Sequence, residues 1–144
     1  MDSRQRRATT RPTGTETQEQ IAVVSFCNWN KIPIVHIPNE GKRSVVAGAM
    51  LKRAGMRSGF PDLFIPVPTS KYHGLMIEMK VGYNKPTEHQ KYWLKLLSNQ
   101  GYMTCLCYGA DEAIKSIRTY LAHEKTYKKD ALEEIEEFVK ENKK

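Results

Sequence analysis

Apolar and polar positions repeat along this 144-residue chain with two periods, one helical and one extended. The first helical repeat places Glu19, Val23 and Phe26 on one face. Just before it, Thr17 and Gln20 have the spacing of a capping box, so we expect the helix to begin near Thr17. Glu19 would then lie above the core-facing stripe and not on the solvent side.

Short apolar runs bounded by proline and glycine predict strands, at residues 34–37, 63–67, 74–81 and 102–108. Residues 68–71 have the length of a hairpin loop between the second and third runs. Pro66 cannot donate to a strand ladder, so it marks the edge of the sheet or the end of a strand. Residues 102–108 have the composition of a buried strand, with Cys105 and Cys107 on one side as core thiols.

Further helices are predicted by the same helical spacing, at residues 45–54, 87–101, 111–121 and 130–144. Ser44 is the expected N-cap of the first, and Thr87 with Gln90 forms a second capping box. Helices and strands therefore alternate, with one hairpin inserted. This order predicts an α/β fold in which helices flank a mixed central sheet.

Composition fits one soluble globular domain with a basic excess. Lys and Arg number 23 against 16 Asp and Glu, which gives a formal charge of +7. Nucleic acid is the commonest partner of such a protein, although general solubility explains the charge equally well. The three cysteines lack disulfide-like spacing, and no apolar run is long enough to span a membrane, so we expect a cytoplasmic protein.

The two ends of the chain differ from its middle. Residues 1–15 are polar and rich in arginine, so we expect a disordered basic arm. Residues 123–144 are dense in charge but keep an apolar stripe, which consists of Leu132, Ile135, Phe138 and Val139. Such an amphipathic helix can pack on its own domain or on a partner, and the pattern favours neither.

The chemistry is concentrated in the segments Gly59-Phe60-Pro61-Asp62 and Ile77-Glu78-Met79-Lys80. If residues 68–71 close the hairpin, Asp62 falls opposite position 77 and within one residue of Glu78. Glu78 and Lys80 are two apart on a strand and share a face. Two carboxylates and one ammonium group are therefore expected at one end of the sheet.

Paired carboxylates repel each other unless a cation or a proton intervenes. Hard oxygen ligands of this kind suit Mg²⁺ or Mn²⁺, which can polarise a phosphodiester and lower the pKa of a bound water. Lys80 would orient that water or stabilise charge on the phosphate. The alternative is a surface salt-bridge cluster across the hairpin.

Together, these motifs resemble the VRR-NUC (virus-type replication-repair nuclease) family of the PD-(D/E)xK nuclease superfamily. The resemblance covers roughly residues 16–121 and extends to further motifs: Glu19-Gln20, the segment 36–43, Gln90 and Gly101-Tyr102. It implies a restriction-endonuclease-like fold in a nuclease domain at residues 16–122. It also implies that Asp62, Glu78 and the Met79 carbonyl bind the metal, with Lys80 catalytic.

The resemblance extends to Glu19 and Gln90, and residue chemistry adds Lys42 and Arg43. Glu19 would complete the acidic cluster, although an acidic residue in a first helical turn also favours the helix dipole. Gln90 would sit beside the site or serve only as a capping-box partner. Lys42 and Arg43 are expected to bind DNA phosphates, or to be a solvated loop. The four histidines share no metal-ligand spacing and are expected to be structural or at the surface.

The leading hypothesis is a Mg²⁺- or Mn²⁺-dependent, structure-specific DNA endonuclease that cuts branched DNA such as four-way (Holliday) junctions. Two matched cuts need two sites, so a homodimer is expected, and the resemblance implies a phage or bacterial source. The alternatives are a restriction-like or nicking nuclease on linear DNA, and a DNA-binding module without catalysis. The intact Asp62, Glu78 and Lys80 argue against the last, because clustered acids would hinder phosphate binding.

Overall fold

The computed structural model describes residues 14–39, 44–122 and 129–143. The elements in chain order are α1 (Glu16–Trp29), β1 (Val35–His36), α2 (Val45–Arg53), β2 (Leu63–Ile65), β3 (Leu75–Lys80), α3 (Glu88–Asn99), β4 (Met103–Tyr108), α4 (Ala110–Ala122) and α5 (Lys129–Glu141). The predicted α/β class and the mixed sheet flanked by helices are confirmed.

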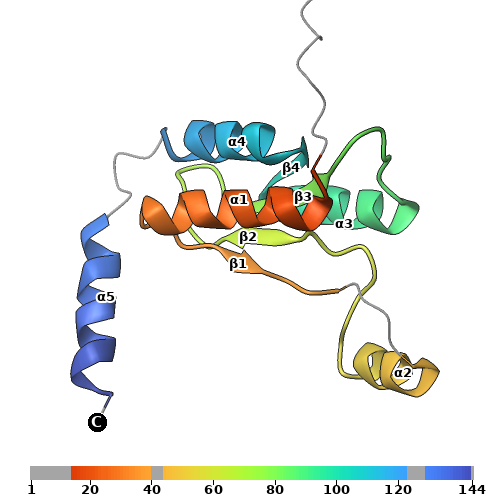
Figure 1. Cartoon of the computed structure of the whole chain (residues 1–144), viewed down its shortest axis with the longest axis horizontal. Helices are drawn as coiled ribbons and strands as arrows, with labels where there is room; N and C mark the ends of the chain where they lie inside the picture. The colour runs from red at the N-terminus through yellow and green to blue at the C-terminus, as the bar shows by residue number, and fades with distance from the viewer. Residues whose placement is uncertain (1–13, 40–43, 123–128, 144) are drawn as a thin grey trace, which may run out of the picture.

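The sheet has the order β1-β2-β3-β4, antiparallel except for the parallel pair of β3 and β4. Helices α1 and α4 cover one face and α3 lies on the other, while α2 and α5 stand apart from the sheet (Figure 1). Every residue of β3 is buried. The strand that carries Glu78 and Lys80 is therefore shielded on both faces.

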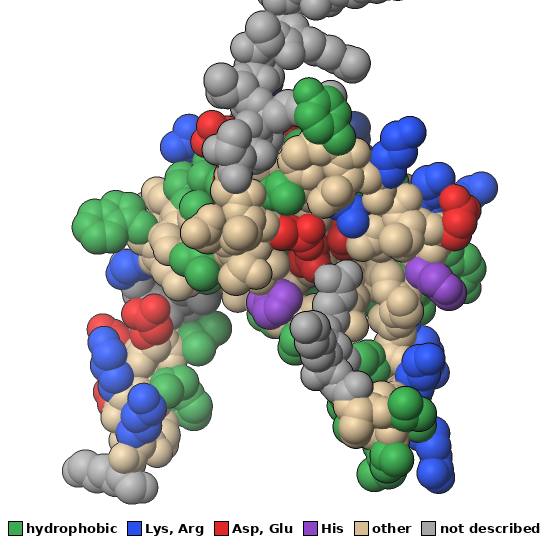
Figure 2. Space-filling view, turned by 45° about the vertical axis from the view of Figure 1, so that its right-hand side comes forward, with side chains coloured by type: hydrophobic (Ala, Val, Ile, Leu, Met, Phe, Trp, Pro, Cys, Tyr) green, Lys and Arg blue, Asp and Glu red, His purple; other side chains and the backbone are tan. Residues whose placement is uncertain are grey.

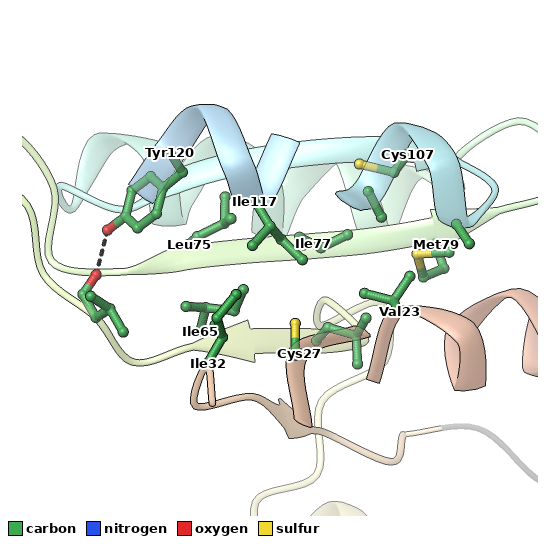
Figure 3. Packing of buried hydrophobic residues seen from close by; sticks show 14 residues of the cluster. Val23, Cys27, Ile32, Ile65, Leu75, Ile77, Met79, Cys107, Ile117 and Tyr120 are labelled. Carbon is green, nitrogen blue, oxygen red and sulfur yellow. Dashed lines mark hydrogen bonds between the residues drawn. The ribbon is translucent and has the colours of Figure 1, made fainter. Parts of the chain in front are cut away.

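The hydrophobic core fills the space between the sheet and the helices α1 and α4 (Figure 3). Its members from these elements are largely or fully buried, namely Val23, Cys27, Leu63, Ile65, Ile77, Met79, Ile117 and Tyr120. Burying one such aliphatic side chain stabilises the fold by about 1.5–3 kcal/mol. The Tyr120 hydroxyl donates to the Val67 carbonyl at 2.6 Å, which ties α4 to the end of the hairpin.

The expected start of the first helix was wrong by two residues. Thr15 is the N-cap of α1, and its capping-box partner is Gln18, with distances of 3.1 and 3.0 Å for the two reciprocal bonds. Thr17 and Gln20 have the same spacing but lie inside the helix, so spacing alone could not distinguish the two pairs. Ser44 and Thr87 cap α2 and α3 as predicted.

The hairpin register differs from the prediction by one residue. Leu63 pairs with Ile77, and the same register continued by one step places Asp62 across from Glu78. The main-chain N–H of Thr69 donates to the carbonyl of Tyr72 at 2.8 Å and closes the turn. The predicted closure by residues 68–71 is therefore wrong. The correction brings the two carboxylates closer than expected.

Two strands also differ from their predicted form. The run at residues 34–37 forms only the two-residue, exposed β1. The predicted buried strand at residues 102–108 is mostly half-buried, with only Cys107 buried, because β4 ends the sheet order and has one strand neighbour. Pro66 follows directly after β2, so it marks a strand end as expected.

The terminal segments are only partly described. The basic arm falls almost wholly outside the described residues. In α5, Ile135, Phe138 and Val139 are exposed, so these three do not pack on their own domain, while the side chain of Leu132 lies outside the described part. None of the helices in the described ranges has the length and apolar character needed to cross a membrane.

Candidate active site

Asp62, Glu78 and Lys80 meet at the end of β3, as the sequence predicts. Their exposed fractions are only 6%, 1% and 8%. The Lys80 ammonium nitrogen lies 4.0 Å from Oε1 of Glu78. Burying charges is costly unless they are paired, so a surface salt-bridge cluster does not describe this group.

Asp62 is held through both its side chain and its main chain. Its Oδ2 accepts the main-chain N–H of Met79 at 2.8 Å. Its carbonyl oxygen accepts the N–H of Ile37 at 2.8 Å and lies 2.9 Å from Nδ1 of His36. The contact of His36 with the site was not predicted, although His36 belongs to a segment that carried the family resemblance.

Gln90 makes both of the contacts that its sequence position left open, one within the helix cap and one beside Glu78. Its Oε1 accepts the N–H of Thr87 at 2.8 Å and completes the capping box of α3. Its Nε2 donates to Oε1 of Glu78 at 2.7 Å. Because Gln90 is itself buried, this bond fixes the Glu78 carboxylate against α3.

Gly59 brings the loop before Asp62 against α3. Its φ is +82°, and a Cβ atom added there would lie 2.6 Å from both the carbonyl carbon and the Cβ of His89. Backbone atoms cannot swing aside, so only glycine fits this contact. The close approach places the Asp62 loop beside Gln90.

Glu19 lies at the same end of the sheet but has its own partner. Its Oε2 accepts the N–H of Ala110 at 2.9 Å, at the start of α4. The neighbouring Gly109 N–H donates to the Lys80 carbonyl at 2.9 Å. Among the described residues, no three His, Cys, Asp or Glu side chains are arranged to hold a metal. A ligand role for Glu19 therefore stays a prediction.

The donor set fits a divalent cation. Asp62 and Glu78 offer hard carboxylate oxygens, which Mg²⁺ and Mn²⁺ prefer. Both side chains are buried, and the Lys80 ammonium lies as far as 4.0 Å from Glu78, so a cation bound between the two carboxylates would offset their mutual repulsion. Figure 2 shows acidic side chains gathered at the centre of one face of the molecule.

A groove that the sequence did not reveal lies beside this site. It has a volume of about 400 Å³ and is lined by Ile37, Pro38, Asn39, Gly55, Met56, Arg57, Phe60 and Trp93. We call it the aromatic groove. Its lining comes from three separate segments, so no local spacing indicates it. The predicted phosphate ligands Lys42 and Arg43 lie outside the described residues.

The structure confirms part of the prediction that Cys105 and Cys107 are core thiols. Cys107 is buried and Cys105 is half-buried on the same side of β4. A hydrogen bond from the Cys107 thiol lowers the pKa of Cys105 to about 7, and that donation raises the pKa of Cys107. Burial raises the pKa of Cys27 to about 11.

Comparison with known proteins agrees with this geometry. The family model of the VRR-NUC domain matches residues 6–111. A solved structure described as a VRR_NUC domain protein is 31% identical, with a TM-score of 0.65, and the match covers 78% of this chain and 92% of that one. No curated protein matches the chain. The chain therefore belongs to the VRR-NUC domain family, a family of nuclease domains of the PD-(D/E)xK type.

Proposed function

We propose that this protein is a Mg²⁺- or Mn²⁺-dependent DNA endonuclease. The observation that carries the proposal is the burial of Asp62 and Glu78 opposite each other at the end of β3, with Lys80 beside them. A divalent cation held there supplies positive charge that polarises a phosphodiester and makes a water molecule more acidic.

Each residue has a distinct task in this proposal. Asp62, Glu78 and the Met79 carbonyl hold the cation, and Lys80 orients the attacking water or stabilises charge on the phosphate. Gln90 keeps the Glu78 carboxylate in place through its 2.7 Å bond. Glu19 extends the acidic end of the sheet from α1.

The substrate strand would be held mainly through its phosphates. The charge of +7 supports this, and we assign Lys42 and Arg43 to the phosphate backbone. DNA affinity should then fall steeply as salt rises. Because phosphate contacts carry no base information, Lys42→Ala and Arg43→Ala should weaken binding to all sequences about equally.

The direct test is incubation with labelled linear, flap, single-stranded and four-way DNAs in Mg²⁺ or Mn²⁺. Lys80→Ala should abolish cleavage, whereas the control Lys91→Ala, an exposed lysine on α3 paired with Glu88, should cut like the parent. Excess EDTA should stop the reaction. Undiminished cleavage in EDTA would refute the metal dependence, and binding of all four DNAs without cleavage would favour a non-catalytic module.

We further propose a homodimer that cuts branched DNA, with the four-way junction as the preferred substrate. The described residues of one chain form one site of this kind, and paired cuts on strands related by a two-fold axis need two. Helix α5 offers a contact surface, since Ile135, Phe138 and Val139 are 57%, 65% and 45% exposed.

Sedimentation tests the dimer. The parent should show twice the monomer mass at micromolar concentration. Phe138→Glu should shift it toward monomer and slow the paired cutting of a junction, while Glu137→Gln on the same helix should change neither. A monomer that cuts linear duplex as fast as a junction would overturn this proposal in favour of a restriction-like or nicking nuclease.

A further inference from the structure

The aromatic groove is not used by the residues assigned to phosphate cleavage. Its volume of about 400 Å³ falls in the range of about 300–1,000 Å³ typical of small-ligand pockets. Two aromatic rings, Phe60 and Trp93, line it together with the aliphatic or thioether side chains of Ile37 and Met56. The lining therefore suits a flat, largely apolar group.

The Trp93 ring and the Phe60 main chain are each held by a hydrogen bond, and the two rings contact each other. Phe60 and Trp93 meet edge to face, with ring centroids 5.1 Å apart. The Trp93 indole N–H donates to the Ser58 carbonyl at 3.1 Å, and the Asn39 side chain donates to the Phe60 carbonyl at 2.5 Å. A ligand that stacks on such preset rings does not have to order them, so less binding free energy is lost.

The groove shares a wall with the proposed cleavage site. Phe60 is two residues before Asp62, and the Ile37 N–H donates to the Asp62 carbonyl at 2.8 Å. Trp93 lies on α3 three residues after Gln90, whose side chain bonds Glu78. A strand with its phosphate at the carboxylates thus runs within reach of both rings.

A fixed positive charge stands at the rim. The Arg57 guanidinium donates through Nη1 to the carbonyls of Lys52 and Met56, at 3.0 and 3.1 Å, while the residue stays exposed. A guanidinium binds phosphate and also stacks on flat rings. Aromatic platforms beside basic side chains are the arrangement by which proteins hold unpaired nucleotides.

We propose that the aromatic groove holds an unpaired nucleobase of the DNA strand that is cut. The inference rests on the proposed nuclease function and specifies its substrate: the base next to the scissile phosphate leaves the stack and lies against Trp93 and Phe60, with Arg57 on the adjoining phosphate. Fully paired duplex cannot offer such a base without paying to unstack it. Junctions, flaps and single strands offer it at lower cost.

The fluorescence of Trp93 can show whether a base is bound in the groove. Because Trp29 is 89% exposed and distant in sequence from the groove, Trp29→Phe leaves Trp93 as the one indole of the chain without touching the lining. This variant is titrated in EDTA, so that no strand is cut. The probes are a duplex with one unpaired thymine, the same duplex with an abasic residue in its place, and the fully paired duplex.

The unpaired thymine should quench Trp93 and bind about tenfold more tightly than the abasic duplex, the difference expected for one stacked base. Trp93→Phe should keep this preference in a fluorescence-anisotropy assay with labelled DNA, and Trp93→Leu should lose it. Arg57→Ala should weaken binding of all three DNAs.

Equal affinity for the thymine and abasic duplexes, with Trp93 unquenched, would overturn the inference. So would a Trp93 signal that changes with protein concentration in the absence of DNA, because the groove would then be covered by a second copy of the chain. A base-dependent signal without cleavage in Mg²⁺ would sustain base binding in the groove and refute the nuclease function. Cleavage without that signal would support the nuclease function and overturn the inference.

Discussion

Asp62 accepts the main-chain N–H of Met79 at 2.8 Å through Oδ2, so one carboxylate both fixes the hairpin and faces the proposed metal. These two contributions can be separated by substitution. An asparagine keeps an oxygen that accepts the bond but loses the charge. An alanine loses both and leaves a buried N–H without its acceptor.

Asp62→Asn should therefore abolish cleavage while leaving the free energy of unfolding nearly unchanged. Asp62→Ala should also abolish cleavage and lower that free energy by about 1–3 kcal/mol. Urea unfolding and the nuclease assay measure the two effects. If Asp62→Asn cuts DNA at the parental rate with a normal metal requirement, Asp62 is not a metal ligand.

Gln90→Glu tests the bond between α3 and Glu78. The glutamate retains an oxygen for the Thr87 N–H, so the helix cap persists. It loses the donor to Glu78 and sets a second carboxylate 2.7 Å away in its place. We expect a loss of activity of about tenfold or more, since a hydrogen bond to a charged group contributes about 1.5–3 kcal/mol. Steady-state rates at several Mg²⁺ concentrations measure it.

Glutamate substitution at the exposed neighbour His89, on the same helical turn, is the control and should leave the rate within about twofold. An unchanged rate for Gln90→Glu would limit Gln90 to capping α3.

Gly59→Ala should destabilise the protein more than Gly82→Ala. Both glycines have positive φ, +82° and +57°, so both substitutions incur backbone strain of about 1–2 kcal/mol. An added Cβ at Gly82 meets nothing within 4 Å, whereas at Gly59 it meets the backbone of His89 at 2.6 Å. Chemical denaturation of the two variants compares them directly. Equal losses would mean that the loop before Asp62 moves freely away from α3.

Cys105 should be the thiol that reacts first at neutral pH. Its pKa of about 7 lies below the ordinary value, so its thiolate fraction rises as the pH passes through 7. Cys27 is buried and its pKa is about 11, so it should stay inert over the same range. Mass spectrometry after brief iodoacetamide treatment at pH 6, 7 and 8 locates the label. Preferential labelling of Cys27 would contradict the assignment.

The sequence predicted those parts of the site that depend on short separations. Glu78 and Lys80 share a strand, and Asp62 reaches them across one hairpin. The capping box of α3 places Gln90 three residues after Thr87. The family resemblance added Glu19. Local patterns of this kind follow from the geometry of a strand, a turn and a helix end. The predicted grouping of the residues therefore stays correct even when the hairpin register is wrong by one residue.

What the sequence could not predict depends on contacts between distant segments. Ile37, Phe60 and Trp93 line one groove from three elements, and their spacing along the chain carries no sign of it. The predicted start of α1 was wrong for a different reason, because Thr15 and Thr17 each begin a segment with capping-box spacing. Only the packed structure distinguishes such equivalent positions.

Helix α4 makes two of the longest-range bonds described above. Its Tyr120 hydroxyl bonds Val67 across 53 residues, and its first N–H bonds Glu19 across 91. During synthesis, these two bonds cannot form until residues 110 and 120 have left the ribosome, so α1 and the hairpin end are not yet tied to α4. Asp62 and Glu78 can already meet across the β2–β3 hairpin at that stage, but Glu19 lacks its partner on α4. Ribosome-bound chains that lack α4 should therefore have an incompletely ordered acidic end, and cleavage should reach its full rate only after this last core helix has docked.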